Sequence, residues 1–112
     1  MKGKIFIVSA PGGAGKTTLV KMLVNTYPDL LIQSISCTTR LPRRGEIDGK
    51  DYVFLTKDAF AKRVQNNEFL EHTKVFGNDY GTLKKTVEVY RNSGRHVILV
   101  IDTEGAKKLK DL

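Results

Sequence analysis

The chain has 112 residues, a hydrophobic fraction of 40% and a charged fraction of 28%, which suit one small globular domain and leave no room for a second. Its net charge of +7 is compatible with nucleic acid, an acidic membrane surface, phosphorylated small molecules, or a merely solvated basic surface. The single cysteine, Cys37, excludes a disulfide within the chain, fits a reducing compartment, and has no evident base for catalysis.

The first third of the chain predicts a strand, a helix and a second strand. Residues 5–8 form a continuous β-branched apolar run, typical of a strand covered on both faces. This run is too short for a signal peptide or a membrane span, so we expect a soluble cytoplasmic protein. A helical apolar stripe follows, made of Leu19, Met22, Leu23 and Tyr27. Pro28 ends this helix, and residues 31–36 predict the second strand.

The middle of the chain begins with loop chemistry. Residues 37–50 hold three arginines, two glycines and a proline. Residues 52–55 predict a short strand, and Thr56 can cap a helix with an apolar face. Residues 69–75 predict another strand, and the glycines and polar residues of 77–81 predict a turn.

The last third predicts a helix, the most hydrophobic strand of the chain, and the start of another helix. Thr82 can cap the first of these helices, and Gly94 fits its carboxyl-terminal position in a left-handed conformation. The strand covers residues 97–101 and ends at Asp102. The final helix would start near Thr103.

This order of elements predicts an α/β protein with a parallel core sheet. Residues 1–35 and 83–112 would form the core, and residues 36–82 a small insert. Only about three core strands are expected and the last helix stops at Leu112, so we expect the core to be incomplete at its carboxyl-terminal end.

A P-loop pattern lies between the first strand and the first helix. Residues 10–17 match G-x-x-x-x-G-K-[ST] at every required position except the first, where alanine replaces glycine. In such a loop backbone N–H groups and the helix N-terminus hold phosphates, Lys16 can bridge the β- and γ-phosphates, and the Thr17 hydroxyl can bind Mg²⁺. The alternative is a glycine-rich turn with an exposed lysine. The predicted ATP-binding residues are Ala10, Pro11, Gly12, Gly13, Ala14, Gly15, Lys16, Thr17 and Thr18.

Asp102 follows the apolar strand, at the edge of an open α/β sheet where ligands collect. This is the expected place for an acid that holds the magnesium ion, here through water. Asp102 can also cap the following helix, and the two roles are compatible.

Two arginines in the insert, Arg40 and Arg43, lie three residues apart with Tyr52 nearby. A guanidinium donates paired hydrogen bonds to phosphate oxygens, so this grouping suits a phosphate monoester. Loop arginines taken alone are more often simply solvated.

Five motifs in order make the chain resemble the guanylate kinases: the P-loop, S-x-T-T-R-x-P-R, G-x-D-Y, N-E-F-L-E and G-x-x-Y-G-T. The match runs through nearly all 112 residues. The resemblance implies a P-loop nucleoside monophosphate kinase fold and transfer of a phosphoryl group from ATP, with Mg²⁺, to GMP, giving ADP and GDP. It also implies that Lys16, Arg40, Arg43 and Asp102 act in catalysis.

The resemblance further implies which residues bind GMP. Those matching phosphate-binding positions are Arg40, Arg43, Tyr52 and Tyr80, and those matching guanine-reading positions are Ser36, Glu71 and Thr82. Guanine offers N1–H and its 2-amino group to a carboxylate such as Glu71, and its O6 accepts from hydroxyls. Adenine reverses the donors and acceptors of this edge, so the carboxylate would face an acceptor. For Glu71 alone, an exposed strand carboxylate would be the default interpretation.

Two departures from the family pattern matter. Val100 stands where the family commonly has a second acid, which puts that acid's role at the metal in doubt. The family's lid arginines have no counterpart in these residues, so we expect the 112 residues alone to be a very poor kinase.

Three rival functions remain. The first is a non-catalytic guanylate-kinase-like module that binds phosphorylated ligands, and the intact Lys16–Thr17 pair opposes it. The second is a P-loop kinase for another acceptor, which Glu71 opposes. The third is a nucleic-acid binder, which is opposed by the concentration of basic residues in the two phosphate motifs. We therefore expect small-molecule substrates, with neither nucleic acid nor membrane as a partner.

Overall fold

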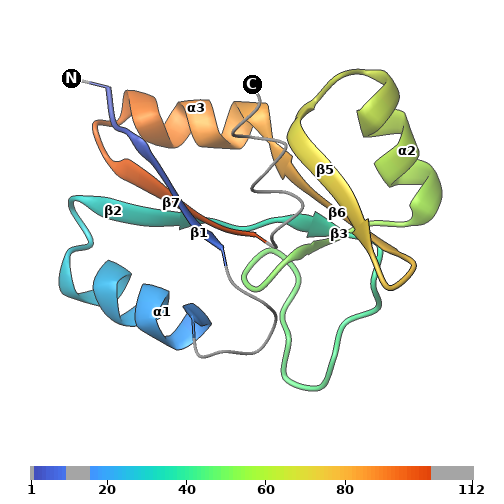
Figure 1. Ribbon diagram of the computed structural model, residues 1–112, viewed down its shortest axis with the longest axis horizontal. Helices are drawn as coiled ribbons and strands as arrows, with labels where there is room; N and C mark the ends of the chain where they lie inside the picture. Colours follow the sequence, from blue (N-terminus) through green and yellow to red (C-terminus); the bar gives the residue numbers. More distant parts are fainter. Residues whose placement is uncertain (1, 10–15, 102–112) are drawn as a thin grey trace. The chain divides into compact units, whose positions relative to one another are not determined.

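A computed structural model describes residues 2–9 and 16–101, with only the backbone described for Ser9, Lys16 and Thr17 (Figure 1). The chain divides into two units. We call Met1–Ser34 with Lys85–Leu112 the core unit, and Ile35–Lys84 the insert unit.

The core unit is built on a three-stranded parallel sheet. Its strands are β1 (Ile5–Ser9), β7 (His96–Ile101) and β2 (Leu31–Ser34), in the order β1-β7-β2. Helices α1 (Lys16–Thr26) and α3 (Lys84–Asn92) are drawn on either side of these strands in Figure 1.

The central strand explains the most hydrophobic run of the sequence. Val97, Ile98 and Leu99 are consecutive and therefore point to alternate faces of the sheet, and all three are buried. A strand buried on both faces must be apolar throughout, which is typical of parallel sheets. The predicted α/β class with a parallel core sheet is confirmed.

The apolar stripe predicted for α1 is not the buried face of this helix. The side chains of Leu19 and Met22 are 56% and 62% exposed, and Leu23 and Tyr27 are exposed too. Val20 is buried instead, and α1 contacts β2 and β7. This helix has two apolar faces, and the β-branched one is turned inward, whereas periodicity had favoured the larger side chains.

The insert unit contains a four-stranded sheet and one helix. The strands are β4 (Val53–Phe54), β3 (Cys37–Thr38), β6 (Asn78–Leu83) and β5 (Phe69–Val75), in that spatial order. Helix α2 (Lys57–Gln65) begins after the predicted cap, since Thr56 Oγ1 accepts a hydrogen bond of 3.1 Å from the Ala59 N–H. Cys37, Phe60 and Phe69 form the buried core of this unit.

Three expectations for the insert are corrected. Cys37–Thr38, placed in a loop, forms strand β3 because its backbone pairs with two strands that lie far away in the sequence. The turn expected at 77–81 lies at Phe76 and Gly77, whose φ angles of 50° and 80° suit a two-residue hairpin. Thr82 therefore lies inside β6 and does not cap α3.

The remaining expectations concern the ends of elements. Strand β2 ends at Ser34, two residues earlier than predicted. Gly94 has the expected left-handed conformation, with φ of 89°. The helix expected near Thr103 lies outside the described residues. No helix in the described part of the chain is long and apolar enough to span a membrane.

Candidate functional site

The insert sheet has one apolar and one polar face, and the polar face carries several of the predicted site residues. Along β6, Gly81 packs against the Phe69 ring on the face that includes Phe60, where an added Cβ would lie 2.7 Å from that ring. Side chains alternate along a strand, so Tyr80 and Thr82 lie on the opposite face. Thr38 is the partner of Tyr80 in β3 and shares that face.

A β-bulge decides which face Glu71 occupies. Phe69 pairs with Leu83, but Glu71 pairs with Thr82, so the register shifts by one residue at Leu70. Without this shift Glu71 would face Gly81 and share the apolar face with Phe69. The bulge turns Phe69 toward the core of the unit and Glu71 toward the polar face.

Glu71 and Thr82 form a buried pair on that face. Thr82 Oγ1 donates a hydrogen bond of 2.8 Å to Glu71 Oε1, and the two residues are 6% and 1% exposed. Ser36 lies one residue before the Cys37–Gly81 pair, as Thr82 lies one residue after it, so the register brings Ser36 next to Thr82. The structure thus brings the three predicted guanine-reading residues to one part of the sheet.

The Arg40 side chain is held by a carboxylate to which we had assigned no role. Arg40 Nη1 and Nη2 donate to Oε1 and Oε2 of Glu46 at 2.9 and 3.0 Å, and Nη1 also donates to the Leu41 carbonyl at 3.1 Å. The pKa of Arg40 is raised mainly by Glu46 and further by the Tyr80 and Tyr52 hydroxyls. Arg40 is therefore a permanent, well-oriented cation.

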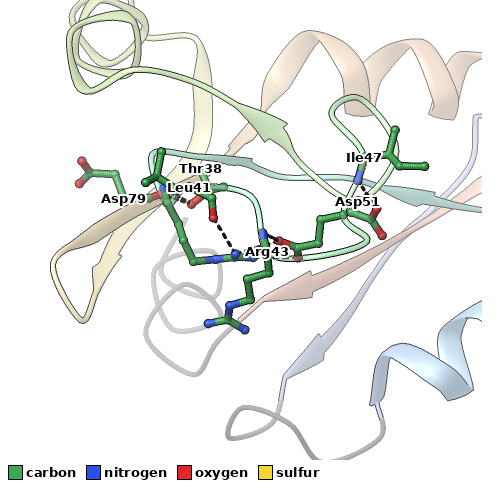
Figure 2. A network of polar contacts seen from close by, with 8 residues as sticks. Thr38, Leu41, Arg43, Ile47, Asp51 and Asp79 are labelled. Carbon is green, nitrogen blue, oxygen red and sulfur yellow. Dashed lines mark hydrogen bonds and ion pairs between the residues drawn. The ribbon is translucent and has the colours of Figure 1, made fainter.

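A tight turn brings Arg43 to the same carboxylate, in the network of Figure 2. The Glu46 N–H donates to the Arg43 carbonyl at 3.0 Å, and the Arg43 N–H donates back to Glu46 Oε1 at 2.6 Å. Gly45 stands at the third position of this turn with φ of 86°, which favours glycine. Hydrogen bonds from Arg40 and then from the Arg43 backbone lower the pKa of Glu46 to about 2.

The two predicted phosphate-binding tyrosines lie near Arg40. The Arg40 Cζ atom is 5.1 Å from the centre of the Tyr52 ring, a cation–π distance. The Tyr52 and Tyr80 ring centres are 6.1 Å apart. Arg40 and Tyr52, which lie outside the strands, therefore come together with Tyr80 of β6, whereas for Arg43 only the backbone contacts are described.

Strands β3 and β6 are joined next to Arg40 and Tyr80 by two threonines. Thr38 Oγ1 donates to the Asp79 carbonyl at 2.9 Å (Figure 2). Thr39 Oγ1 accepts from the Asp79 N–H at 2.9 Å. Thr38 Oγ1 also accepts from the Arg40 N–H at 3.2 Å. These bonds fix the backbone of Arg40 relative to that of Tyr80.

The predicted ATP and metal residues lie largely outside the described residues. Ala10–Gly15 and Asp102 are not described, the side chains of Lys16 and Thr17 are not described, and Thr18 is exposed. Ser9 and Ile101, which precede these two segments, are partners in the sheet. In the part of the chain that is described, no three His, Cys, Asp or Glu residues gather as a metal site.

Cys37 and Val100 also lie among the described residues. Burial raises the pKa of the Cys37 thiol to about 11, so this cysteine stays protonated at neutral pH. Val100 lies half-buried in β7.

Sequence reasoning missed Glu46, the threonine–Asp79 bonds and the bulge at Leu70. Only Glu46 left a usable signal in the sequence. Gly45 indicates a turn, and a carboxylate directly after it can accept a hydrogen bond from a backbone N–H of that turn. The other two depend on the pairing of distant strands.

Comparison with known proteins gives a consistent result. A family model described as guanylate kinase matches residues 2–112. A guanylate kinase of Protochlamydia amoebophila is 53% identical over 111 residues, which are 99% of this chain and 56% of that protein. One from Clostridium perfringens strain 13 is 49% identical over 110 residues, 98% of this chain and 50% of that protein. The chain spans about half the length of these curated relatives.

A solved structure agrees with the fold. The crystal structure of guanylate kinase from Anaplasma phagocytophilum superposes with a TM-score of 0.79 at 38% identity, covering 98% of this chain and 54% of that one. The α/β architecture with a parallel sheet is therefore that of a P-loop kinase fold.

Proposed function

Because this chain belongs to the guanylate kinase family, we propose that it acts in transferring the γ-phosphoryl group of ATP to GMP, giving ADP and GDP. A GMP phosphate oxygen forms the new bond to the γ-phosphorus, and the bond from that phosphorus to the bridging oxygen of ADP breaks. Such a transfer requires little covalent participation by the protein. Catalysis rests on aligning the two nucleotides and on neutralising charge.

The polar face of the insert sheet is the observation that carries the proposal. Its buried Glu71–Thr82 pair suits the guanine edge, because the carboxylate accepts from N1–H and the 2-amino group. The Ser36 hydroxyl can donate to O6, and so can the Thr82 hydroxyl when it turns from Glu71 to the base. Tyr80 lies two residues from Thr82 on the same face, about 7 Å along the strand. That spacing leaves room for a ribose between base and phosphate.

We assign the GMP phosphate to Arg40, Arg43, Tyr52 and Tyr80. Arg40 is charged and held in place, and the two tyrosine hydroxyls interact with it. Fixed guanidinium groups orient the GMP phosphate toward the γ-phosphate of ATP. They also offset the negative charge of the two phosphate groups as they approach each other. We assign a catalytic role to Arg40 and Arg43 on this basis.

We assign the ATP phosphates to residues 10–18, with Lys16 on the β- and γ-phosphates. The Thr17 hydroxyl and the Asp102 carboxylate are oxygen donors of the kind that Mg²⁺ prefers, with Asp102 acting through water. When bound, the ion would offset charge on the ATP phosphates. These assignments rest on the P-loop pattern and on family membership.

Calorimetric titration of the protein with GMP and AMP tests base recognition. A site built on polar pairing can discriminate by about 10⁴-fold, because the wrong base leaves buried groups unpaired. Equal affinity for the two nucleotides would overturn guanine recognition.

A coupled assay for ADP formation with GMP and Mg-ATP tests the transfer step. GMP binding without any Mg-ATP binding would favour the non-catalytic module.

A further inference from the structure

The Glu46 carboxylate contacts both arginines of the proposed phosphate site. Its Oε1 accepts from Arg40 Nη1 at 2.9 Å and from the Arg43 N–H at 2.6 Å, and its Oε2 accepts from Arg40 Nη2 at 3.0 Å. The side chains of Arg40 and Glu46 are 11% and 20% exposed, so water screens this pair only partly.

The donors of Arg40 divide between two edges of the guanidinium group. This group has five N–H bonds, arranged as an end-on fork (Nη1 and Nη2) and a side-on fork (Nε and Nη2). Glu46 takes the end-on fork, and the Leu41 carbonyl takes the second Nη1–H. Neither Glu46 nor Leu41 takes Nε–H and the second Nη2–H, which together make up the side-on fork, and the Tyr52 and Tyr80 hydroxyls also interact with Arg40. A phosphate that receives two parallel hydrogen bonds from this fork therefore leaves Glu46 in place.

We propose that Glu46 is the positioning residue of the phosphate site, holding the end-on edge of Arg40 so that the nucleotide phosphate is bound by the side-on edge. Glu46 stays bound to Arg40 when the nucleotide arrives. This inference rests on the proposed function, since it takes the GMP phosphate as the ligand.

Two features of the structure favour positioning over simple charge balance. Glu46 closes the Arg43–Glu46 turn through two hydrogen bonds, so the same carboxylate orders the backbone that carries Arg43. Fixing a long side chain before the ligand arrives removes an entropy cost from binding. A carboxylate beside a phosphate is also repulsive, so its presence weakens binding unless the ordering outweighs the repulsion.

Calorimetric titration of the 112-residue chain with GMP separates these two effects by sign. In Glu46→Gln the amide would point an N–H group at an arginine N–H, and we expect the GMP Kd to rise about tenfold or more, the scale of one charge-assisted hydrogen bond. Glu46→Asp keeps the charge but is one methylene too short to span both arginines, and its Kd should rise as well. Tighter GMP binding by Glu46→Gln, or unchanged binding by Glu46→Asp, would overturn the proposal.

Glu68→Gln is the matched control. Glu68 forms an ion pair of 3.0 Å with Arg63 in the same unit, and its side chain bonds to Arg63 and Asn66, neither of which is assigned to GMP. This variant removes the same charge and breaks an arginine–glutamate pair, so it should leave the GMP Kd within about twofold of wild type. An equal loss in Glu46→Gln and Glu68→Gln would assign the effect to charge or to general destabilisation and would overturn the proposal.

The ¹⁵N-edited NMR signals of the Arg40 side chain give a readout that a purely structural role would not change. GMP should shift the Arg40 Nε–H signal and one Nη2–H signal of wild type downfield, while the Nη1–H signals keep the pattern of the free protein. If the Nη1–H signals change and Nε–H does not, the phosphate has displaced Glu46 and the proposal is wrong.

The failure of this inference differs from the failure of the proposed function. If wild type does not bind GMP, the proposed function is wrong. The Arg40 signals of the free protein still test the division of donors in that case, because Glu46→Gln should make the Nη signals average by rotation while Glu68→Gln should not. Unchanged Nη signals in free Glu46→Gln would overturn the inference by themselves.

Discussion

The core unit and the insert unit carry their candidate site residues in different ways. In the core unit these residues form one continuous run, 10–18, together with Asp102 directly after β7. In the insert unit they come from β5, β6 and the segments beside β3 and β4, and their common position depends on how β3, β5 and β6 pair. A continuous motif can be recognised in sequence, whereas a surface composed from several strands depends on register.

The sheet types explain this difference. The parallel sheet of the core unit has its central strand buried on both faces, so polar groups concentrate at the strand ends. The mainly antiparallel insert sheet buries one face against α2 and keeps a polar face along its length. Base recognition is a task for the second kind of surface, since it needs several side chains spread over an area.

The largest effect on nucleotide binding is expected for Glu71 in the insert unit. Glu71→Gln keeps the shape of the side chain and an oxygen for Thr82, but it replaces the charged acceptor that guanine would use. We expect the GMP Kd to rise at least about 100-fold, because two hydrogen bonds to a charged group are lost. AMP binding, weak in wild type, should be unaffected. Calorimetry with both nucleotides measures this, and a parallel loss of both would mean that Glu71 supports the fold and does not read the base.

A smaller effect tests whether the two units bind their nucleotides independently. Lys16→Ala removes the cation assigned to the ATP phosphates, and we expect the Mg-ATP Kd to rise by about 30-fold or more. GMP affinity should stay within about twofold of wild type, because the GMP residues belong to the other unit. Unchanged Mg-ATP affinity would contradict the assignment of the P-loop, and a large loss of GMP affinity would break the separation of the two units.

The two units also differed in how far the sequence predicted their structure. In the core unit the apolar strand at 97–101 and the strand–helix–strand order are both confirmed. A strand buried on both faces is apolar throughout, and such a run is easily recognised in the sequence. In the insert unit Cys37–Thr38 and 78–83 were not recognised as strands. Short strands beside glycine-rich turns carry little local signal, and their pairing with distant residues decides their structure.

Thr82 shows the same limit for the candidate site. A threonine before an apolar helical pattern is typical of a helix cap, and local reasoning placed it there. In the structure it is a strand residue opposite Glu71, and only the bulge at Leu70 makes them partners. Alternation alone would put Glu71 on the face of Phe69. A one-residue shift in pairing reverses the face of every later residue in the strand, and no local pattern reports it.

A substitution at Gly81 tests the packing that supports the polar face. An added Cβ would lie 2.7 Å from the Phe69 ring, so Gly81→Ala must displace that ring and should lower the free energy of unfolding by about 1–3 kcal/mol. Urea denaturation followed by fluorescence or circular dichroism measures the change. Phe69→Leu combined with Gly81→Ala provides the control, because a smaller side chain makes room for the methyl group. Strictly additive effects of the two substitutions would show that this contact does not set the stability of the insert.

The smallest expected effect compares one carboxylate from each unit. The pKa of Glu46 in the insert unit is lowered from 4.5 to about 2, mainly by Arg40, and the pKa of Glu88 in the core unit is lowered mainly by Lys2. A carboxyl whose pKa is lower in the folded state stabilises the fold above its unfolded value and loses that contribution as the pH falls through the folded value. Glu46→Gln should therefore flatten the loss of stability between about pH 4.5 and 2, and Glu88→Gln should flatten the loss that begins as the pH falls below 4.5.

Salt separates the two contributions. Glu88 is 44% exposed, and a Debye length of about 3 Å at 1 M salt screens its pair with Lys2. The Arg40–Glu46 fork is less exposed and is made of two direct hydrogen bonds, so it should persist. Urea unfolding at pH 3 to 6 in low and high salt is the measurement. The expected result is a salt-sensitive difference for Glu88→Gln and a salt-resistant one for Glu46→Gln. An equally salt-sensitive difference for both would mean that Glu46 is an ordinary surface ion pair and not a fixed part of the site.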